Sequence, residues 1–396
     1  MSDIDWIAPH YYNTVYYFAF LVLAWITILY HVGSSTQKVL TSEGGGISQP
    51  FSLLCTVFFI YYLGLRPVAG VFIDMPMYGL YYSGVSFDTP YVPINLHGEW
   101  LWRDLNVFCG HMGLNVNEFF FVIELIYLGG MYVCCLLLMR QNLWLSMLFF
   151  FTAFSTYSYG TNGVRNGLAC SIELVALCLL ASESQAKRVV SFILMFLTLG
   201  IHRSTMLPTA AALATVYVVK DTKLAFRFWL ISIALSLTIA PIVESFFVAL
   251  GFDDRMTSYN QGQYNAENEE IFSATGFRWD FLLYSSGPVA MIWYVTRYRR
   301  FTDLAYTIFA NCYLLCNAFW IIVIRSSFSN RFAYLSWFLY PVVIAYPLLR
   351  MNLWKDQDRK TAIILFFYSA FLFYMYFIYY FGTSGFKGFD LYWWRE

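Results

Sequence analysis

The stretch FFFVIELIYLGGMYVCCLLLM, residues 119–139, decides the kind of fold that this chain adopts. Its only charged residue is Glu124, and a basic residue, Arg140, follows directly. As an α-helix that rises about 1.5 Å per residue, the stretch is about 30 Å long, which matches the hydrocarbon core of a bilayer. It therefore predicts a transmembrane helix.

Similar apolar runs follow one another along the whole chain, separated by short polar breaks. Of the 396 residues, 59% are hydrophobic and 12% are charged, whereas soluble proteins carry roughly a quarter of their residues as charges. The predicted fold class is an all-α polytopic membrane protein, with residues 1–396 forming a single integral membrane domain. About twelve transmembrane helices are expected, which begin near residues 11, 51, 117, 143, 165, 189, 205, 226, 279, 302, 332 and 361.

The basic residues predict how the chain faces, because cytoplasmic loops carry an excess of lysine and arginine. If every predicted span crosses the membrane, alternate loops face the same side. One of these two sets of loops holds fourteen of the 24 basic residues and contains both lysine and arginine. The opposite set contains arginine alone until Lys387 in the tail. The first set is therefore assigned to the cytoplasm, and both termini are expected outside. The net charge of zero gives no support for binding nucleic acid.

Two external loops are predicted to be substantial, at residues 66–116 and 251–278. In the first, apolar residues recur at helical spacing: Leu101, Leu105, Phe108 and Met112. This spacing predicts an amphipathic helix, either lying in the membrane interface or packed on the external ends of the spans. The second loop is polar, acidic and rich in tyrosine and asparagine, which suits a segment that covers a site.

Arginines at the external ends of spans carry the clearest chemical signal. An arginine presents a planar fork of donors that binds phosphate in a bidentate manner and stays charged when buried. Charged groups at membrane depth usually face a cavity or a partner. Four are therefore predicted to converge on one anion-binding cavity, in GTNGVRNG, GIHRST and RSSFSNR: Arg165, Arg203, Arg325 and Arg331. The alternative is that they reach the headgroups or pair with nearby carboxylates.

Other candidates lie near these four. Arg278 and Asp280, in GFRWDF, open the next span, and Arg66 begins the first external loop. His202 adjoins Arg203, and a neutral imidazole is the form that accepts a proton from a sugar hydroxyl. A structural, hydrogen-bonded histidine is the competing interpretation. No histidine pair has the spacing of metal ligands, so no metal is expected.

Two glutamates within predicted spans, Glu124 and Glu173, have two interpretations. Intramembrane carboxylates relay protons in transporters. Alternatively, Glu173, which lies eight residues after Arg165 and thus about two helical turns away, holds that arginine in place. We favour the structural role.

Several motifs together suggest a family. The series GTNGVRNGLACSIELVAL, followed by a basic turn and FLTLGIHRSTMLP, resembles the EpsG-like family of polysaccharide polymerases. GFRWDFLLYSS and RSSFSNRFAYLSWFLYPVVIAYP are similar to the later part of enterobacterial O-antigen polymerases of the Wzy type, and EWLWRDLNVFCGHMGLNVNEFFFVIELI is also similar. The resemblance covers most of residues 60–350. It departs at LRPVAGVFIDMPMY, where only Asp74 and Tyr78 stand for a glycine, aspartate and tyrosine pattern.

The resemblance implies an O-antigen or surface polysaccharide polymerase in the bacterial cell inner membrane, without a cofactor. Such an enzyme transfers the growing glycan from undecaprenyl pyrophosphate to the non-reducing end of a new lipid-linked repeat unit at the periplasmic face. Its implied partners are the undecaprenyl-pyrophosphate-linked oligosaccharide, membrane lipids, and a chain-length regulator and flippase of the same pathway.

The candidate residues fit this reaction. Four of them would grip the pyrophosphate, namely Arg165, Arg203, Arg325 and Arg331, while His202 accepts the proton of the acceptor hydroxyl. Arg66, Arg278 and Asp280 would bind or position the substrate. A flippase for lipid-linked repeat units and a ligase that uses the same lipid donor are the competing functions.

Overall fold

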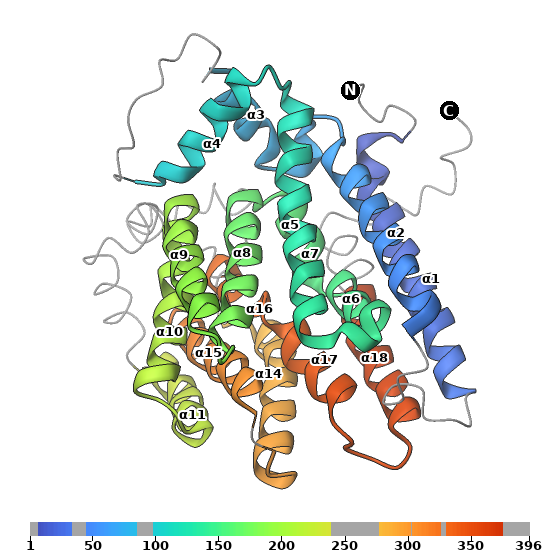
Figure 1. Ribbon diagram of the computed structural model, residues 1–396, viewed down its shortest axis with the longest axis vertical. Coiled ribbons are helices and arrows are strands. Elements are labelled where there is room, and N and C mark those ends of the chain that lie inside the picture. The colour runs from blue at the N-terminus through green and yellow to red at the C-terminus, as the bar shows by residue number, and fades with distance from the viewer. Residues whose placement is uncertain are drawn as a thin grey trace.

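The computed structural model describes residues 7–33, 45–84, 98–238, 277–301, 303–325 and 330–374. Throughout these ranges the chain forms helices joined by short turns, and they contain no strand. The helices form one bundle, with two short helices crossing one of its ends (Figure 1). The predicted all-α fold class is confirmed.

The first half of the bundle pairs the first helix with the last one and the second helix with a long central helix. α1 (Tyr12–Val32) packs against α18 (Gln357–Tyr374), and α2 (Gly45–Gly64) packs against α5 (Val116–Met139).

A capping box starts α5: the side chain of Asn115 accepts from the backbone N–H of Glu118, and the Glu118 carboxylate accepts from the backbone N–H of Asn115, each at 2.9 Å. These bonds define where the chain enters the bundle from the preceding helix.

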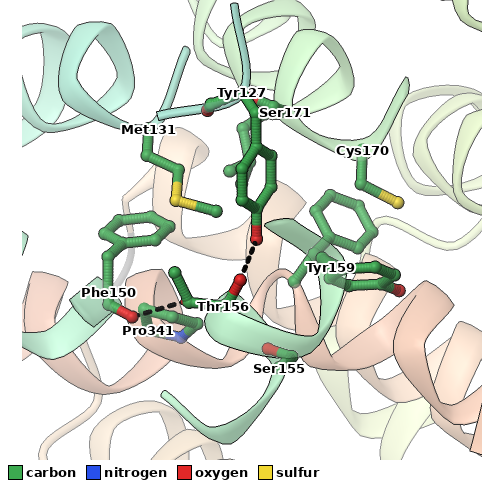
Figure 2. Close-up of a pocket in the computed structure, with 11 residues that line it drawn as sticks. Tyr127, Met131, Phe150, Ser155, Thr156, Tyr159, Cys170, Ser171 and Pro341 are labelled. Carbon is green, nitrogen blue, oxygen red and sulfur yellow. Dashed lines mark hydrogen bonds between the residues drawn. The ribbon is translucent and has the colours of Figure 1, made fainter. Parts of the chain in front are cut away.

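The span predicted near residue 143 is two short helices, so the expectation of one continuous helix is wrong there. α6 (Leu143–Phe151) ends at Thr152, and α7 (Phe154–Thr161) begins after an extended residue, Ala153. Figure 2 shows how side chains satisfy the backbone that the break frees: the Thr156 hydroxyl donates to the Phe150 carbonyl at 2.6 Å, and the Tyr127 hydroxyl donates to the Thr156 carbonyl at 3.0 Å. α8 (Val164–Leu180) follows.

The second half surrounds α15 (Leu304–Ile322), which packs against α10 (Met206–Tyr217) and α11 (Thr222–Thr238). α8 pairs with α9 (Gln185–Ile201). α14 (Trp279–Trp293) ends in a π-helical turn, Tyr294–Tyr298. α16 (Asn330–Trp337) leads into α17 (Tyr340–Arg350), which packs against α6, α14 and α15.

Four helical stretches in the described residues are long and apolar enough to cross a membrane: Pro9–Val32, Val116–Phe151, Leu304–Ile322 and Arg331–Arg350. Every other predicted span begins within six residues of the start of a described helix, but these helices are shorter or less apolar. The protein therefore has membrane-spanning character, while the number of twelve stays a prediction. The orientation in the membrane also stays a prediction.

The helices that cross one end of the bundle are α3 (Met75–Gly84) and α4 (Trp100–His111), at the top of Figure 1. α4 packs on α9 at Gly200, where an added Cβ would lie 2.6 Å from the Trp100 ring. Trp102 is buried, whereas Phe108 and Met112 are exposed. Both helices belong to the first predicted external loop, and residues 251–276 of the second lie outside the described residues.

Candidate functional site

A carboxylate at the start of α4 joins two of the predicted site residues. Glu99, the N-cap residue of α4, has one oxygen 2.7 Å from Nδ1 of His202, and its other oxygen accepts from the Arg165 guanidinium. Arg165 also donates from Nε to the Tyr78 hydroxyl at 3.3 Å, and its guanidinium lies 5.4 Å from the centre of that ring. Three elements thus meet at one carboxylate: α4, the first turn of α8, and the turn after α9.

The carboxylate of Glu99 is ionised. Burial alone would raise the pKa of Glu99, but the hydrogen bond with His202, the charge of Arg165 and the backbone N–H of Arg203 together lower this pKa below its usual value. The side chains of Glu99 and His202 are both 21% exposed. The arrangement is therefore a charged contact that is partly shielded from water and still open to a ligand.

Local backbone geometry directs His202 and Arg165 toward Glu99. His202 ends α9 in an extended conformation, with φ −149° and ψ 112°, so its side chain leaves the helix axis. Thr205 holds this turn, because its hydroxyl donates to the His202 carbonyl at 2.7 Å. Before α8, the Asn162 side chain accepts from the backbone N–H of Asp74 at 3.2 Å, which ties the start of α8 to the first external loop.

Two further predicted arginines lie beside this contact. The Arg203 side chain is exposed, and one of its terminal nitrogens lies 3.9 Å from where a Cβ on Gly98 would stand. Arg331, at the start of α16, lies 3.8 Å from the Asp74 carboxylate, and Asp74 is also within electrostatic range of Arg165. We call this set the Glu99 cluster, and its members are Asp74, Tyr78, Glu99, Arg165, His202, Arg203 and Arg331.

The structure places the remaining candidates in two other groups. The Arg278 guanidinium donates two hydrogen bonds to the Asp280 carboxylate, of 2.9 and 2.7 Å. It also lies 3.8 Å from the centre of the Phe281 ring. Arg325 is exposed, 6.0 Å from the ring centre of Phe277, the neighbour of Arg278. Arg278, Asp280 and Arg325 thus form a second group near the start of α14, and their substrate contacts stay predictions.

Arg66 is buried completely inside the bundle. Its guanidinium donates to the Glu124 carboxylate at 3.2 Å, to the Thr161 carbonyl at 3.4 Å and to the Leu63 carbonyl. Because this side chain has no exposed surface, it reaches a substrate only if the helices around it move. Its role in substrate binding stays a prediction, and its contacts in the structure are those of an internal ion pair.

The interpretation of Glu173 as the residue that holds Arg165 is wrong. The two Glu173 oxygens accept from the hydroxyls of Thr198 and Thr209, each at 3.2 Å. Glu173 therefore links α8 to α9 and α10, and Arg165 is held by Glu99 instead. The helical spacing of Arg165 and Glu173 placed them on one helix, but two turns are too far for the pair to meet.

Glu99 is a candidate site residue that sequence reasoning missed. It stands directly before the predicted amphipathic helix, where a carboxylate is common simply because it stabilises a helix start. Neither partner of Glu99 is near it in the chain, since Arg165 lies 66 residues later and His202 lies 103 residues later. The available signal was an acidic residue beside the tryptophans that open an amphipathic helix.

Comparison with known proteins gives a family match. The model described as the EpsG family matches residues 51–390, a range that contains every member of the Glu99 cluster. No curated protein and no solved structure matches the chain.

Proposed function

Because this chain belongs to the EpsG family, we propose that it is a polysaccharide polymerase of the inner membrane. It transfers the growing glycan from undecaprenyl pyrophosphate to the non-reducing end of a new lipid-linked repeat unit at the periplasmic face. The observation that carries this proposal is the Glu99 cluster, where basic residues from the start of α8, the turn after α9 and the start of α16 lie near one another at one end of the bundle.

The chemistry of the transfer matches the charges of the cluster. The acceptor hydroxyl oxygen attacks C1 of the donor sugar, the bond between C1 and the phosphate oxygen breaks, and its electron pair stays on the departing pyrophosphate. Guanidinium groups stabilise the charge that grows on that oxygen. Arg203 has an exposed side chain, so it is the guanidinium of the cluster that a diphosphate reaches most directly.

Glu99 prepares His202 to accept the proton of the acceptor hydroxyl. An ionised carboxylate only accepts hydrogen bonds, so Nδ1 of His202 carries the hydrogen that it donates over 2.7 Å. In the neutral imidazole the lone pair then lies on Nε2, which becomes the proton acceptor. Glu99 also stabilises the imidazolium that forms, in the same way that a carboxylate assists histidine in hydrolytic triads. Glu99 is therefore a positioning residue.

The proposal is tested in cells that lack the gene and carry it on a plasmid. With the gene deleted, single-repeat caps on the surface polysaccharide indicate a polymerase, whereas complete loss of repeats indicates a flippase or a ligase. Arg165→Ala and Arg331→Ala should each abolish long chains at normal protein level, and Arg165→Lys should also impair them because lysine lacks the planar fork. Unchanged ladders in both alanine variants would refute the phosphate-binding role.

The matched control removes an arginine from the same end of the protein. Arg103, on α4, pairs with its neighbour Asp104 at 2.9 Å and not with a member of the Glu99 cluster, and an ion pair between partly exposed side chains contributes about 0–1 kcal/mol. Arg103→Ala should therefore leave the ladder unchanged. For the proposed base, His202→Ala is expected to remove long chains, and undiminished polymer in that variant would contradict the assignment.

A further inference from the structure

A second cluster of basic residues lies at the end of the bundle opposite to α3 and α4. The start of α11 and the end of α14 line a pocket there, and both helix ends are at the bottom of Figure 1. Its charged members are Lys223, Arg227 and Arg297, and the side chains of all three are exposed. We call this hollow the α11–α14 pocket.

The pocket carries three positive charges that its own walls do not neutralise. No acidic residue is among the described residues that line it. Asp221, two residues before Lys223, uses its carboxylate to accept from the backbone N–H of Lys223 at 2.9 Å. Three cations around one hollow repel one another until an anion enters, so the pocket is complementary to a phosphate group.

The surface beside the pocket is apolar, which suits an amphiphile better than a soluble anion. Lys223 and Arg227 are four residues apart on α11 and share a face, and Leu230 and Ile231 continue that face beyond Arg227. Leu230 is 48% exposed and Ile231 is 53% exposed. On α14, Trp293 lines the pocket and is 48% exposed, and tryptophan commonly lies at the level of lipid headgroups.

We propose that the α11–α14 pocket binds the phosphate headgroup of an anionic phospholipid, whose acyl chains lie along Leu230 and Ile231. Basic pockets between membrane helices recognise such headgroups, and the inner leaflet supplies them. The predicted cytoplasmic position of these basic residues agrees with this. The site is separate from the Glu99 cluster, so the inference does not depend on the proposed polymerase activity.

The test measures lipid binding by the full-length protein in neutral detergent. Native mass spectrometry and thermal melting are carried out with phosphatidylglycerol, with phosphatidylcholine and with inorganic phosphate. Phosphatidylglycerol should bind and raise the melting temperature, and phosphatidylcholine should not. Arg227→Gln with Arg297→Gln should weaken phosphatidylglycerol binding about thirtyfold, since each cation near a lipid phosphate contributes about a factor of five.

The matched control removes the same charge elsewhere on the predicted cytoplasmic side. Arg140 and Lys187 are exposed and do not line the pocket, so Arg140→Gln with Lys187→Gln should bind phosphatidylglycerol like the wild type. The single variant Arg297→Gln, at an exposed position, provides a second measurement if the double variant is poorly produced. The proposal is overturned if the pocket variants bind phosphatidylglycerol like the control, or if inorganic phosphate stabilises the protein equally well.

Discussion

Replacing Glu99 with glutamine keeps the shape of this side chain and removes its negative charge. In the protein, one carboxylate oxygen accepts from His202 and the other accepts from Arg165. A glutamine amide has one acceptor oxygen, so it serves one of these donors and must turn its NH₂ group toward the other. One hydrogen bond to a charged group is lost, which corresponds to about 1.5–3 kcal/mol.

This loss should be visible as a slower reaction. Since 1.4 kcal/mol is a factor of ten in rate, we expect kcat of Glu99→Gln to fall about ten- to hundredfold. KM should change less than kcat, because Glu99 acts through His202 and Arg165 and is itself a positioning residue. The assay uses purified protein in proteoliposomes with lipid-linked repeat units, and the products are resolved by chain length on a gel.

A second carboxylate on the same helix provides the control. Asp104 pairs with its neighbour Arg103 and not with His202 or Arg165, so Asp104→Asn should keep kcat within about twofold of the wild type. The reasoning is refuted if Glu99→Gln, at wild-type protein level, elongates chains at the wild-type rate. Equal losses in the Glu99 and Asp104 variants would also refute it, because a general disturbance of α4 would then explain both.

Three further predictions concern the stability of the same region and of the core, each measured by thermal melting in detergent. Because the pKa of Glu99 is lowered in the folded protein, its stabilisation is present above the unfolded pKa of about 4.3 and is lost as pH falls through the folded value. The difference in melting temperature between wild type and Glu99→Gln should therefore be constant from about pH 6 to 8 and shrink below about pH 4. A difference that is still unchanged at pH 3 would contradict this. Gly200→Ala should destabilise the protein by about 1–3 kcal/mol, because its Cβ would lie 2.6 Å from a ring atom of α4, whereas Gly129→Ala, with nothing within 4 Å of the added Cβ, should not. Glu124→Leu should cost about 3–5 kcal/mol by leaving Arg66 charged and buried, and adding Arg66→Met should recover much of it; a loss below about 1 kcal/mol would show that water reaches the pair.

The positions of the helices could be predicted from the sequence because apolar runs and helical spacing are local properties. Residues 119–139 lie within α5, and every predicted span begins at or near a described helix. The break between α6 and α7 could not be predicted in this way. It depends on Tyr127, from another helix, and on Thr156, whose hydrogen bonds satisfy the interrupted backbone.

The sequence by itself determined which side chains were candidates for the site, because arginine and histidine at span ends are unusual residues in an apolar chain. Only the tertiary structure decided their partners: Arg165 and His202 meet at Glu99, whereas Arg66, an arginine of the same type, is enclosed in the core beside Glu124. The physical reason is that an ion pair forms where distant segments touch. Here that contact exists because α4 docks on α9 at a glycine, and neither charge nor spacing along the chain encodes that docking.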